Sequence, residues 1–277
     1  MQLTGRVGVV TGGGSGIGRA LCLALAGKAC AGVVVADIDE EAAQAVATEV
    51  EAAGVPALAV ACDVGDPMQV DGLLHLAVER FGTVHLVCNN AGILRSGAAW
   101  ETTLEEWDAT FAVNVWGVVN GVRTFVPHLI AQGEGHVVNT ASLAGLTTNA
   151  GLAAYNVSKH AVVALTETLQ RDLVLSGHVG VGVSVLCPGL VSTPIVDDPV
   201  TRSGATDVGR MIGEALAASI PSSMDPADVA AAVVAAVEAG TFYVLTHPDQ
   251  TIPMVELRLG DIVGGRTPGA SASPDPA

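Results

Sequence analysis

Tyr155 and Lys159 are the two residues in this sequence whose types and spacing most clearly suit catalysis. The chain has only two tyrosines and two lysines, and one of each falls in the segment YNVSK, four positions apart. On a helix, that spacing places both side chains on one face. A phenol with its ordinary pKa of about 10 is a poor base at neutral pH, but a lysine ammonium one turn away stabilises the phenolate. The pair therefore predicts acid/base chemistry at the tyrosine hydroxyl.

The size of the pKa change that this chemistry requires indicates where the pair must lie. Lowering a tyrosine pKa by about 3 units corresponds to roughly 4 kcal/mol, more than an exposed ion pair supplies. We therefore expect Tyr155 and Lys159 in a partly buried site, where a second positive charge assists the lysine. His160 follows Lys159 directly but points about 100° away from it on a helix. We do not expect His160 to take part.

A glycine-rich turn near the start of the chain can hold a phosphate group. The first apolar run leads into the sequence TGGGSGIG at residues 11–18, and a helical pattern begins at about Ile17. Glycines let a backbone approach a pyrophosphate, whose charge is then stabilised by the free N–H groups of the helix N-terminus. The spacing of Gly12, Gly16 and Gly18 is G-x-x-x-G-x-G rather than the common G-x-G-x-x-G. A simple tight turn is therefore the alternative.

Acidic residues end the next two predicted strands. Asp37 lies 19 residues after Gly18, where a nucleotide-binding βαβ unit places an acid on the adenosine ribose hydroxyls. The alternative for Asp37 is a helix cap, which Asp39 could provide equally well. Asp63 and Val64 end the third strand and are predicted to lie beside the adenine.

The elements that must position these residues alternate along the chain. Short β-branched runs, which we expect to be buried strands, occur at residues 7–10, 32–36, 55–61, 86–89, 136–140, 181–187 and 241–246. Helical patterns lie near residues 17–29, 39–53, 67–80, 103–132, 155–176 and 226–239. This repetition predicts an α/β fold, with a doubly wound parallel seven-stranded sheet in a single domain over residues 1–264.

Three further segments have recognisable ends or composition. The helix at 226–239 has Asp225 as its predicted N-cap and Gly240 just beyond its end. Residues 191–222 interrupt the alternation with Pro, Asp, Ser and Gly around a short helical pattern at 207–218, and we expect a lid over the substrate there. Residues 265–277 lack apolar side chains to bury and are expected to be a disordered tail.

The composition excludes several classes of protein. Half of the 277 residues are hydrophobic and 14% are charged, which rules out a disordered or fibrous chain. A net charge of −16 argues against nucleic acid or an anionic membrane as a partner. Two stretches without charge, 135–158 and 173–196, are broken too often by Gly, Pro, Asn or Ser to span a membrane. No export signal precedes the first strand, so we expect a cytoplasmic protein.

The cysteines and histidines do not suggest a metal site. Five cysteines lie far apart in the sequence, which fits neither a disulfide framework nor paired zinc ligands. The seven histidines are scattered. We therefore expect chemistry without a metal.

Six motifs together resemble the short-chain dehydrogenase/reductase family. They are TGGGSGIG at 11–18, NNAG at 89–92, Asn114 in NVWG, Ser142, YNVSK at 155–159 and CPGLVST at 187–193. The motifs occur in the family's order over about residues 5–250, and the spacing of 13 from Ser142 to Tyr155 matches the family pattern. The resemblance implies a Rossmann fold that binds NAD and transfers a hydride between nicotinamide and a secondary alcohol or ketone.

The resemblance also implies a role for each residue of the site. Tyr155 would exchange a proton with the substrate oxygen, and Ser142 would donate a hydrogen bond to that oxygen. Lys159 would bind the nicotinamide ribose and lower the pKa of Tyr155, while Asn114 would hold a water that links Lys159 to solvent. The implied cofactor-binding set is Gly12, Ser15, Gly16, Ile17, Gly18, Asp37, Asp63, Val64, Asn90, Ala91, Gly92, Tyr155, Lys159, Pro188, Gly189, Val191 and Thr193. Taken singly, Ser142 could be a turn residue, Asn114 a polar group satisfied within its helix, and the two asparagines of NNAG a strand-end turn.

We expect NAD rather than NADP as the cofactor. The Asp37 carboxylate would repel the additional phosphate of NADP. Family members that choose NADP usually carry a basic residue within the glycine loop or just after the acid, and Ser15 and Ile38 occupy those places.

The predicted substrate is a small, uncharged, hydrophobic alcohol or ketone. Apolar residues expected to form its pocket are Leu94, Leu143, Leu152, Leu190 and Ile195, with Met211 and Ile212 from the lid. Arg95 could instead pair with a substrate carboxylate, but an exposed loop arginine is the favoured interpretation.

The same sequence leaves two alternative functions open and also suggests an oligomeric state. The fold could serve as a nucleotide sensor or scaffold without turnover, although such a protein does not need Asn114, Ser142, Tyr155 and Lys159 together. It could also reduce an acyl-carrier ketone, although an acidic chain would repel an acidic carrier. By resemblance, we expect a homotetramer built partly from the helices at 103–132 and 155–176.

Overall fold

Seven parallel strands form one sheet with the order β3-β2-β1-β4-β5-β6-β7. The strands are β1 (Val7–Thr11), β2 (Gly32–Asp37), β3 (Ala57–Ala61), β4 (Leu86–Asn89), β5 (Gly135–Thr140), β6 (Val181–Cys187) and β7 (Tyr243–Leu245). This computed structural model describes residues 1–196 and 206–268. The expected doubly wound parallel sheet is confirmed. The strand order reverses between β1 and β4, and in such sheets a ligand binds in the crevice beyond the carboxyl ends of the strands at this point.

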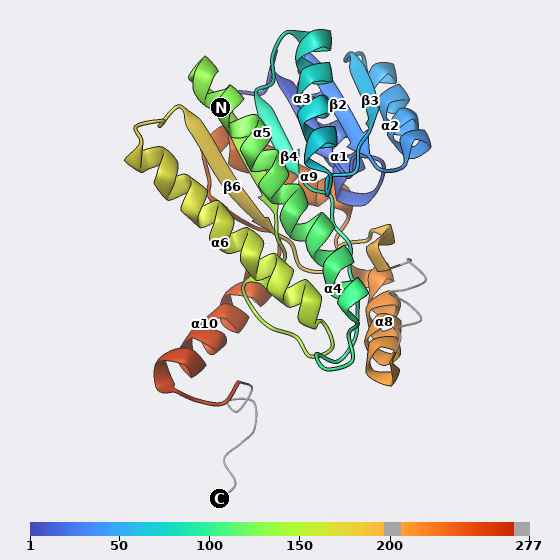
Figure 1. The fold of residues 1–277 in the computed structure, drawn as a ribbon, viewed down its shortest axis with the longest axis vertical. Helices are drawn as coiled ribbons and strands as arrows, with labels where there is room; N and C mark the ends of the chain where they lie inside the picture. Colours follow the sequence, from blue (N-terminus) through green and yellow to red (C-terminus); the bar gives the residue numbers. More distant parts are fainter. Residues whose placement is uncertain (197–205, 269–277) are drawn as a thin grey trace, which may run out of the picture.

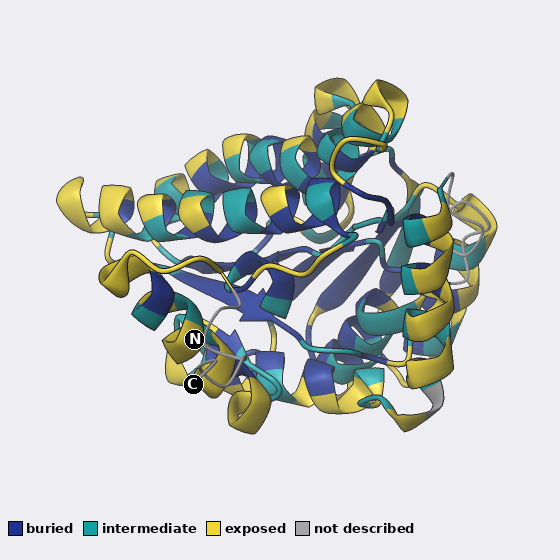
Figure 2. Cartoon of the chain, turned by 90° about the horizontal axis from the view of Figure 1, so that it is seen from below, coloured by how far each residue is buried: buried dark blue, intermediate teal, exposed yellow. Residues whose placement is uncertain are grey.

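Helices cover both faces of the sheet (Figure 1). They are α1 (Gly16–Gly27), α2 (Glu40–Ala52), α3 (Pro67–Phe81), α4 (Leu104–Phe111), α5 (Gly117–Gln132), α6 (Ala153–Leu175), α8 (Asp207–Ser219), α9 (Pro226–Ala239) and α10 (Pro248–Gly264). One core cluster joins α1, α2 and α9 to the sheet, and a second joins α3, α5 and α6 to the opposite face. The buried sheet lies between helices whose outer sides are exposed (Figure 2).

The strands are valine-rich because both of their faces are buried. In β1, Val10 packs with the first core cluster and Val9 with the second. In β2, Val33 and Val35 belong to the first cluster and Val34 to the second. Alternate side chains of a strand point to opposite faces, so a run of β-branched residues fills both cores at once.

The helix ends follow the capping residues in the sequence. Asp225 accepts a hydrogen bond of 2.8 Å from Ala227 N at the start of α9, and Gly240 has the left-handed conformation that ends this helix. Asp39 accepts a hydrogen bond of 3.1 Å from Ala42 N and caps α2. Because Asp39 provides the cap, the carboxylate of Asp37 is not needed for it.

The segment predicted as one helix over 103–132 contains a change of helix type. Between α4 and α5, residues Ala112–Trp116 form a π-helical turn, η1, in the same continuous helical run. Thr103 and Glu106 form a capping box at the start of α4, where this helical run begins. Such widened turns are rare and often occur at functional sites, and Asn114 lies within this one.

The sequence analysis did not predict α10. Its large apolar side chains are exposed on more than one side, with fractions from 39% at Met254 to 88% at Val263, and Pro253 lies inside the helix. Pro253 and the glycines at 260 and 264 weaken the helical signal of this segment in the sequence. Figure 1 shows α10 projecting away from the sheet.

Part of the expected lid and most of the expected tail lie outside the described residues. These segments are 197–205 and 269–277. Within the predicted lid, α8 (Asp207–Ser219) agrees with the helical pattern at 207–218.

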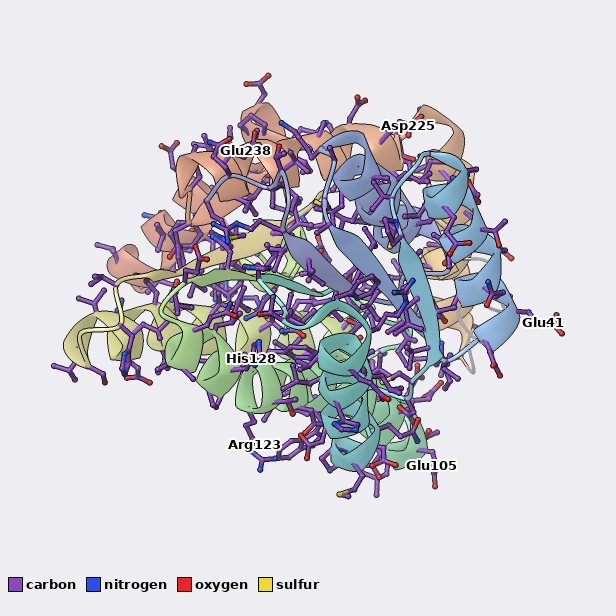
Figure 3. The ribbon with its side chains drawn as sticks, turned by 90° about the horizontal axis from the view of Figure 1, so that it is seen from above. Glu41, Glu105, Arg123, His128, Asp225 and Glu238 are labelled. Atoms are coloured by element: carbon purple, nitrogen blue, oxygen red, sulfur yellow. The ribbon has the colours of Figure 1, made fainter. Side chains whose placement is uncertain are left out.

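The surface of the molecule is acidic. The carboxylates of Glu41, Glu105 and Asp225 point outward from α2, α4 and the start of α9 (Figure 3). Across the described parts of the chain, every helix is too short or too polar to pass through a bilayer.

Candidate active site

A cavity of about 740 Å³ lies beyond the carboxyl ends of the central strands. It contains the residues that follow β1, β2, β3, β4, β5 and β6, together with the start of α6. Of the residues predicted for cofactor, catalysis and substrate, all except Gly18, Asn114 and Met211 line it. The sheet thus brings together side chains that are more than 100 positions apart in the sequence.

The glycine loop occupies one end of the cavity. Gly12 and Gly16 have positive φ angles of 61° and 50°, and a Cβ atom on Gly12 would lie 2.8 Å from Ala91 Cα. A Cβ atom on Gly18 would lie 1.9 Å from Gly12 O. Gly18 therefore permits α1 to pack on the turn and does not itself face the cavity.

The N-terminus of α1 suits an anionic group. Ser15 is the N-cap, and within the described chain neither a side-chain cap nor an acidic residue occupies the first turn. The N–H groups of that turn therefore keep their hydrogen-bonding capacity, and the helix dipole favours negative charge there. The loop fits a pyrophosphate.

Asp37 is held at the end of β2 by backbone donors. Its Oδ2 accepts a hydrogen bond of 2.8 Å from Gly14 N, and its Oδ1 accepts one of 3.1 Å from Asp39 N. An ionised carboxylate has about four acceptor positions, so two ribose hydroxyls can still donate to it. Ile38, 75% exposed, lines the cavity beside Asp37. The next basic residue after the glycine loop, Arg19, is paired with Glu49 at 3.0 Å.

The residues after β3 form a second wall at this end. Asp63 Oδ1 accepts a hydrogen bond of 2.8 Å from Gly65 N, which fixes the turn. Val64 is buried, and its carbonyl accepts a hydrogen bond of 2.9 Å from Asn120 Nδ2 on α5. Both predicted residues border the cavity.

The NNAG segment joins three strands beneath the cavity. The backbone N–H groups of Asn90 and Ala91 donate to Thr11 Oγ1 at 3.0 and 3.2 Å, which ties β4 to β1. Asn89 Nδ2 donates to Asn139 Oδ1 on β5 at 2.8 Å. The side chains therefore connect strands while the backbone of 90–92 borders the cavity.

Tyr155, Ser142 and Lys159 meet at the other end. Tyr155 stands in the first turn of α6, is 9% exposed and has a hydrogen bond with the Ser142 side chain. Ser142 also accepts a hydrogen bond of 3.1 Å from Ala144 N, so it is a turn residue as well. Lys159 is 2% exposed, and its Nζ donates to Thr140 O at 2.9 Å.

Burial shifts the pKa values of Tyr155 and Lys159. Burial raises the pKa of Tyr155, and the hydrogen bond with Ser142 opposes that rise only in part. Burial lowers the pKa of Lys159 to about 8, with a smaller opposing effect from the Cys187 thiol. The effect of Lys159 and a bound nicotinamide on the pKa of Tyr155 stays a prediction. Desolvation outweighs the attraction because both groups are deeply buried.

Asn114 lies behind the cavity instead of lining it. Its Oδ1 accepts a hydrogen bond of 2.8 Å from Ile93 N, and its Nδ2 donates to Ile93 O at 2.9 Å and to Ser158 Oγ at 3.0 Å. The side chain therefore clamps the chain after β4 to α6. The alternative of a polar group satisfied within its own helix is wrong, because the partners of Asn114 lie in the loop after β4 and in α6.

The predicted substrate end is apolar and is covered by α8. Leu94, Ala144 and Leu152 are buried beside Tyr155, and Ile212 and Leu216 of α8 pack on them. The loop after β4 contacts α8 through Ser96 Oγ, which donates to Gly209 O at 2.9 Å.

Several residues that line the cavity were not predicted from the sequence. Ala144, Asn149, Ala215, Leu216 and Ser219 line the cavity but were not predicted. For α8, the spacing of 212, 215, 216 and 219 was the available signal, because these positions share one face of a helix. Met211 was expected near the pocket but is 59% exposed and does not line the cavity. Arg95 also lies outside the lining, and its Nη1 donates to Leu94 O at 3.0 Å.

Comparison with known proteins agrees with the motifs. A family model described as short chain dehydrogenase matches residues 6–202. The chain is 39% identical over 255 residues to a 1-deoxy-11-beta-hydroxypentalenate dehydrogenase from Streptomyces exfoliatus, covering 91% of this chain and 86% of that protein.

Two solved structures are also similar. A short chain dehydrogenase/reductase from Burkholderia phymatum, in complex with NAD, is 40% identical with a TM-score of 0.92, covering 100% of this chain and 99% of that one. A 3-ketoacyl-(acyl-carrier-protein) reductase from Brucella melitensis, complexed with NADH, is 30% identical with a TM-score of 0.74, covering 88% and 96%. The NAD complex agrees with the predicted cofactor.

Proposed function

Because this chain belongs to the short-chain dehydrogenase family, we propose that it transfers a hydride between NAD and a secondary alcohol or ketone. The observation that carries the proposal is the cavity itself. One end has an uncapped helix N-terminus and an acidic strand end, and the other has Tyr155 hydrogen-bonded to Ser142. A dinucleotide and a small substrate fit end to end in such a site.

The glycine loop and Asp37 hold the adenosine and pyrophosphate part of NAD in this proposal. The N–H groups at the start of α1 face the pyrophosphate, and Asp37 accepts hydrogen bonds from the adenosine ribose. Pro188 and Gly189 border the nicotinamide end of the cavity. The bound nicotinamide supplies the hydride acceptor or donor.

Tyr155 transfers the proton. Its phenolate accepts a proton from the substrate alcohol, or in the reverse direction its hydroxyl donates one to the ketone oxygen, and Ser142 donates a hydrogen bond to the same oxygen. Lys159 sits one helical turn away from Tyr155, and its charge stabilises the phenolate once positive charge on the oxidised cofactor adds to it. Asn114 supports this arrangement by fixing the chain after β4 against α6, and the water between Lys159 and solvent remains part of the proposal.

The substrate in this proposal is small, uncharged and hydrophobic. The pocket beside Tyr155 is formed by leucine, isoleucine and alanine side chains, and its polar groups, Asn149 and Ser219, are neutral. The segment 191–222 acts as the lid, of which α8 is the part that packs on the pocket. The Streptomyces relative is named as a dehydrogenase of a hydroxypentalenate, so cyclic alcohols belong among the first compounds to test.

A panel of secondary alcohols and ketones, assayed in both directions with NAD and NADP, tests the proposal. Turnover of neutral alicyclic alcohols with NAD is the expected result. Binding of NAD without turnover of any compound would favour the sensor or scaffold. A ketoacyl thioester that is reduced faster than all free ketones would favour the acyl-carrier reductase, which the Brucella relative makes a reasonable rival.

We also propose a homotetramer and a location in the cytoplasm. Exposed apolar side chains on the helices predicted to assemble include Leu104, Trp116, Val157 and Leu175, and α10 adds Ile252 to Val263. Large exposed apolar patches usually mark interfaces. In this proposal the domain ends near residue 264, just before Arg266, whose Nε donates to Asp261 Oδ1 of α10 at 3.0 Å, and removing the residues beyond that contact leaves assembly unchanged.

A further inference from the structure

His247 lies directly beside the peptide that borders the nicotinamide end of the cavity. β7 pairs with β6 up to Cys187 and Leu245, and the segments that follow these two strands continue side by side. Gly189 N donates a hydrogen bond of 3.2 Å to His247 Nδ1. A Cβ atom on Gly189 would lie 2.8 Å from that nitrogen, so the imidazole packs against the glycine with no space for a side chain.

This contact determines the tautomer of His247. A backbone N–H can only donate, so Nδ1 must be the unprotonated acceptor and the ring proton of the neutral imidazole sits on Nε2. The Thr246 hydroxyl is 2.7 Å from the same Nδ1 atom and therefore donates to it as well. His247 thus offers one acceptor atom to two donors.

The other side of the same peptide contacts the catalytic loop. The carbonyl of Pro188 accepts a hydrogen bond of 2.8 Å from Leu143 N and one of 3.5 Å from Ser142 Oγ. The Pro188 carbonyl and the Gly189 N–H belong to one planar unit. The hydrogen bond that Gly189 N donates to His247 on one edge, and the one that Pro188 O accepts from Leu143 N on the other, therefore fix the rotation of this single peptide.

We infer that His247 is a positioning residue for the reaction proposed above. It acts through the Pro188–Gly189 peptide on two things at once, namely the wall at the nicotinamide end and the backbone of Leu143, next to Ser142. Loss of the Nδ1 acceptor leaves the Gly189 N–H without its partner and lets the peptide rotate. Displacement of a catalytic group by about 1 Å can reduce turnover on the order of 100-fold. The inference rests on the proposed function, because it assigns His247 to that same site.

Two variants of nearly equal shape separate the hydrogen bond from simple packing. His247→Asn keeps an uncharged acceptor oxygen close to the place of Nδ1, whereas His247→Leu has the same branching without an acceptor. We expect His247→Leu to lower kcat by about 10-fold or more and His247→Asn to stay within about 3-fold of the parent protein. The NAD dissociation constant, measured by quenching of protein fluorescence, should also rise in the leucine variant alone.

His85 provides a matched control at the other end of the sheet. Its Nδ1 accepts a backbone hydrogen bond from Val7 N at 3.2 Å, the same atom and distance as in His247, but at the start of β1. Both histidines are partly buried. His85→Leu should therefore lower the Tm much as His247→Leu does, because each leaves one N–H unpaired, but it should leave kcat within about 2-fold.

The outcomes separate this inference from the proposed function. If the parent protein turns over none of the alcohols or ketones, the proposed function fails. If the parent is active and His247→Leu retains its kcat and NAD affinity, the assignment of His247 is wrong. Equal losses of kcat in the asparagine and leucine variants, or in His85→Leu and His247→Leu, would likewise overturn it, since they would trace the effect to packing or stability.

Discussion

The Nζ atom of Lys159 lies 5.7 Å from the centre of the Tyr155 ring. Its hydrogen bond goes to the carbonyl of Thr140 at 2.9 Å and not to the tyrosine. Burial lowers the pKa of Lys159 to about 8 and raises the pKa of Tyr155. In the proposed mechanism, the positive charge of an oxidised nicotinamide therefore adds to that of Lys159 when Tyr155 acts as a base.

Replacing Tyr155 by Phe tests its role in proton transfer. The variant should fold and bind NAD like the parent, because the ring still fills its place among Leu94 and Leu152. Turnover should fall by at least about 100-fold, since only the transferable proton is lost. Steady-state rates together with NAD titration would show this. Turnover close to that of the parent would refute the mechanism.

Replacing Lys159 by Ala should impair both turnover and cofactor affinity. The ammonium group is 2% exposed and faces the cavity from one helical turn beyond Tyr155. In contrast with Tyr155→Phe, the NAD dissociation constant should rise by about 10-fold or more, because a charge-assisted hydrogen bond to the ribose is lost. If NAD affinity were unchanged and turnover reduced, Lys159 would act only on Tyr155 and would not bind the cofactor.

The sheet and the glycine loop were predictable because their signals are local. Valine runs buried on both faces identify the strands, and Asp225 and Gly240 identify the ends of α9. The π-helical turn around Asn114 was not predictable, because its wider hydrogen-bond spacing leaves no distinct sequence pattern. The role of His247 depends on the pairing of β6 with β7 across 58 positions. Helix α10 escaped prediction because Pro253, Gly260 and Gly264 lie within it and are poor helix formers.

The stability of the protein should fall in mild acid because of His136. This residue is 2% exposed in β5, and burial, with a smaller effect of the chain's N-terminal ammonium group, lowers its pKa from 6.5 to about 4. Between these values the unfolded chain binds a proton that the folded protein does not, so the free energy of unfolding decreases as pH falls through this window. From about pH 7.5 to about pH 5 the loss attributable to His136 should be about 2 kcal/mol.

Urea unfolding at the two pH values measures this loss. His136→Gln cannot bind the proton but can still form a hydrogen bond with Ser184, which lies 2.8 Å from His136 Nε2. Its free energy of unfolding should therefore depend less on pH than that of the parent. The same pH dependence in both proteins would assign the acid sensitivity to other groups.

Arg95 should have little influence on substrate choice. It does not line the cavity, whereas the pocket beside Tyr155 is apolar. Arg95→Ala should therefore change kcat/KM for neutral alcohols by less than about 3-fold. The prediction would be wrong if carboxylate-bearing substrates were the fastest and lost rate specifically in Arg95→Ala. The substrate would then be an anion that pairs with Arg95.

Preference for NAD over NADP should depend on Asp37 and its neighbours. The carboxylate is fixed by Gly14 N and Asp39 N at the point where the adenosine ribose is expected. An additional phosphate would meet this negative charge at short range and remove the ribose hydrogen bonds. Repulsion and lost hydrogen bonds together should cost roughly 2 to 4 kcal/mol, which is about 30-fold to 1,000-fold in kcat/KM.

The surroundings of Asp37 do not offset that repulsion. Ile38 is apolar and Ser15 is neutral, while Arg19 is engaged by Glu49. Replacing Asp37 by Ser and Ile38 by Arg should move the ratio of kcat/KM values towards NADP, because the charge that repels the phosphate is exchanged for one that attracts it. Circular dichroism must show that the double variant is folded. Equal use of both cofactors by the parent protein would show that Asp37 does not bind the adenosine ribose. A double variant that unfolds would instead show that the hydrogen bonds of Asp37 with Gly14 and Asp39 are needed for folding.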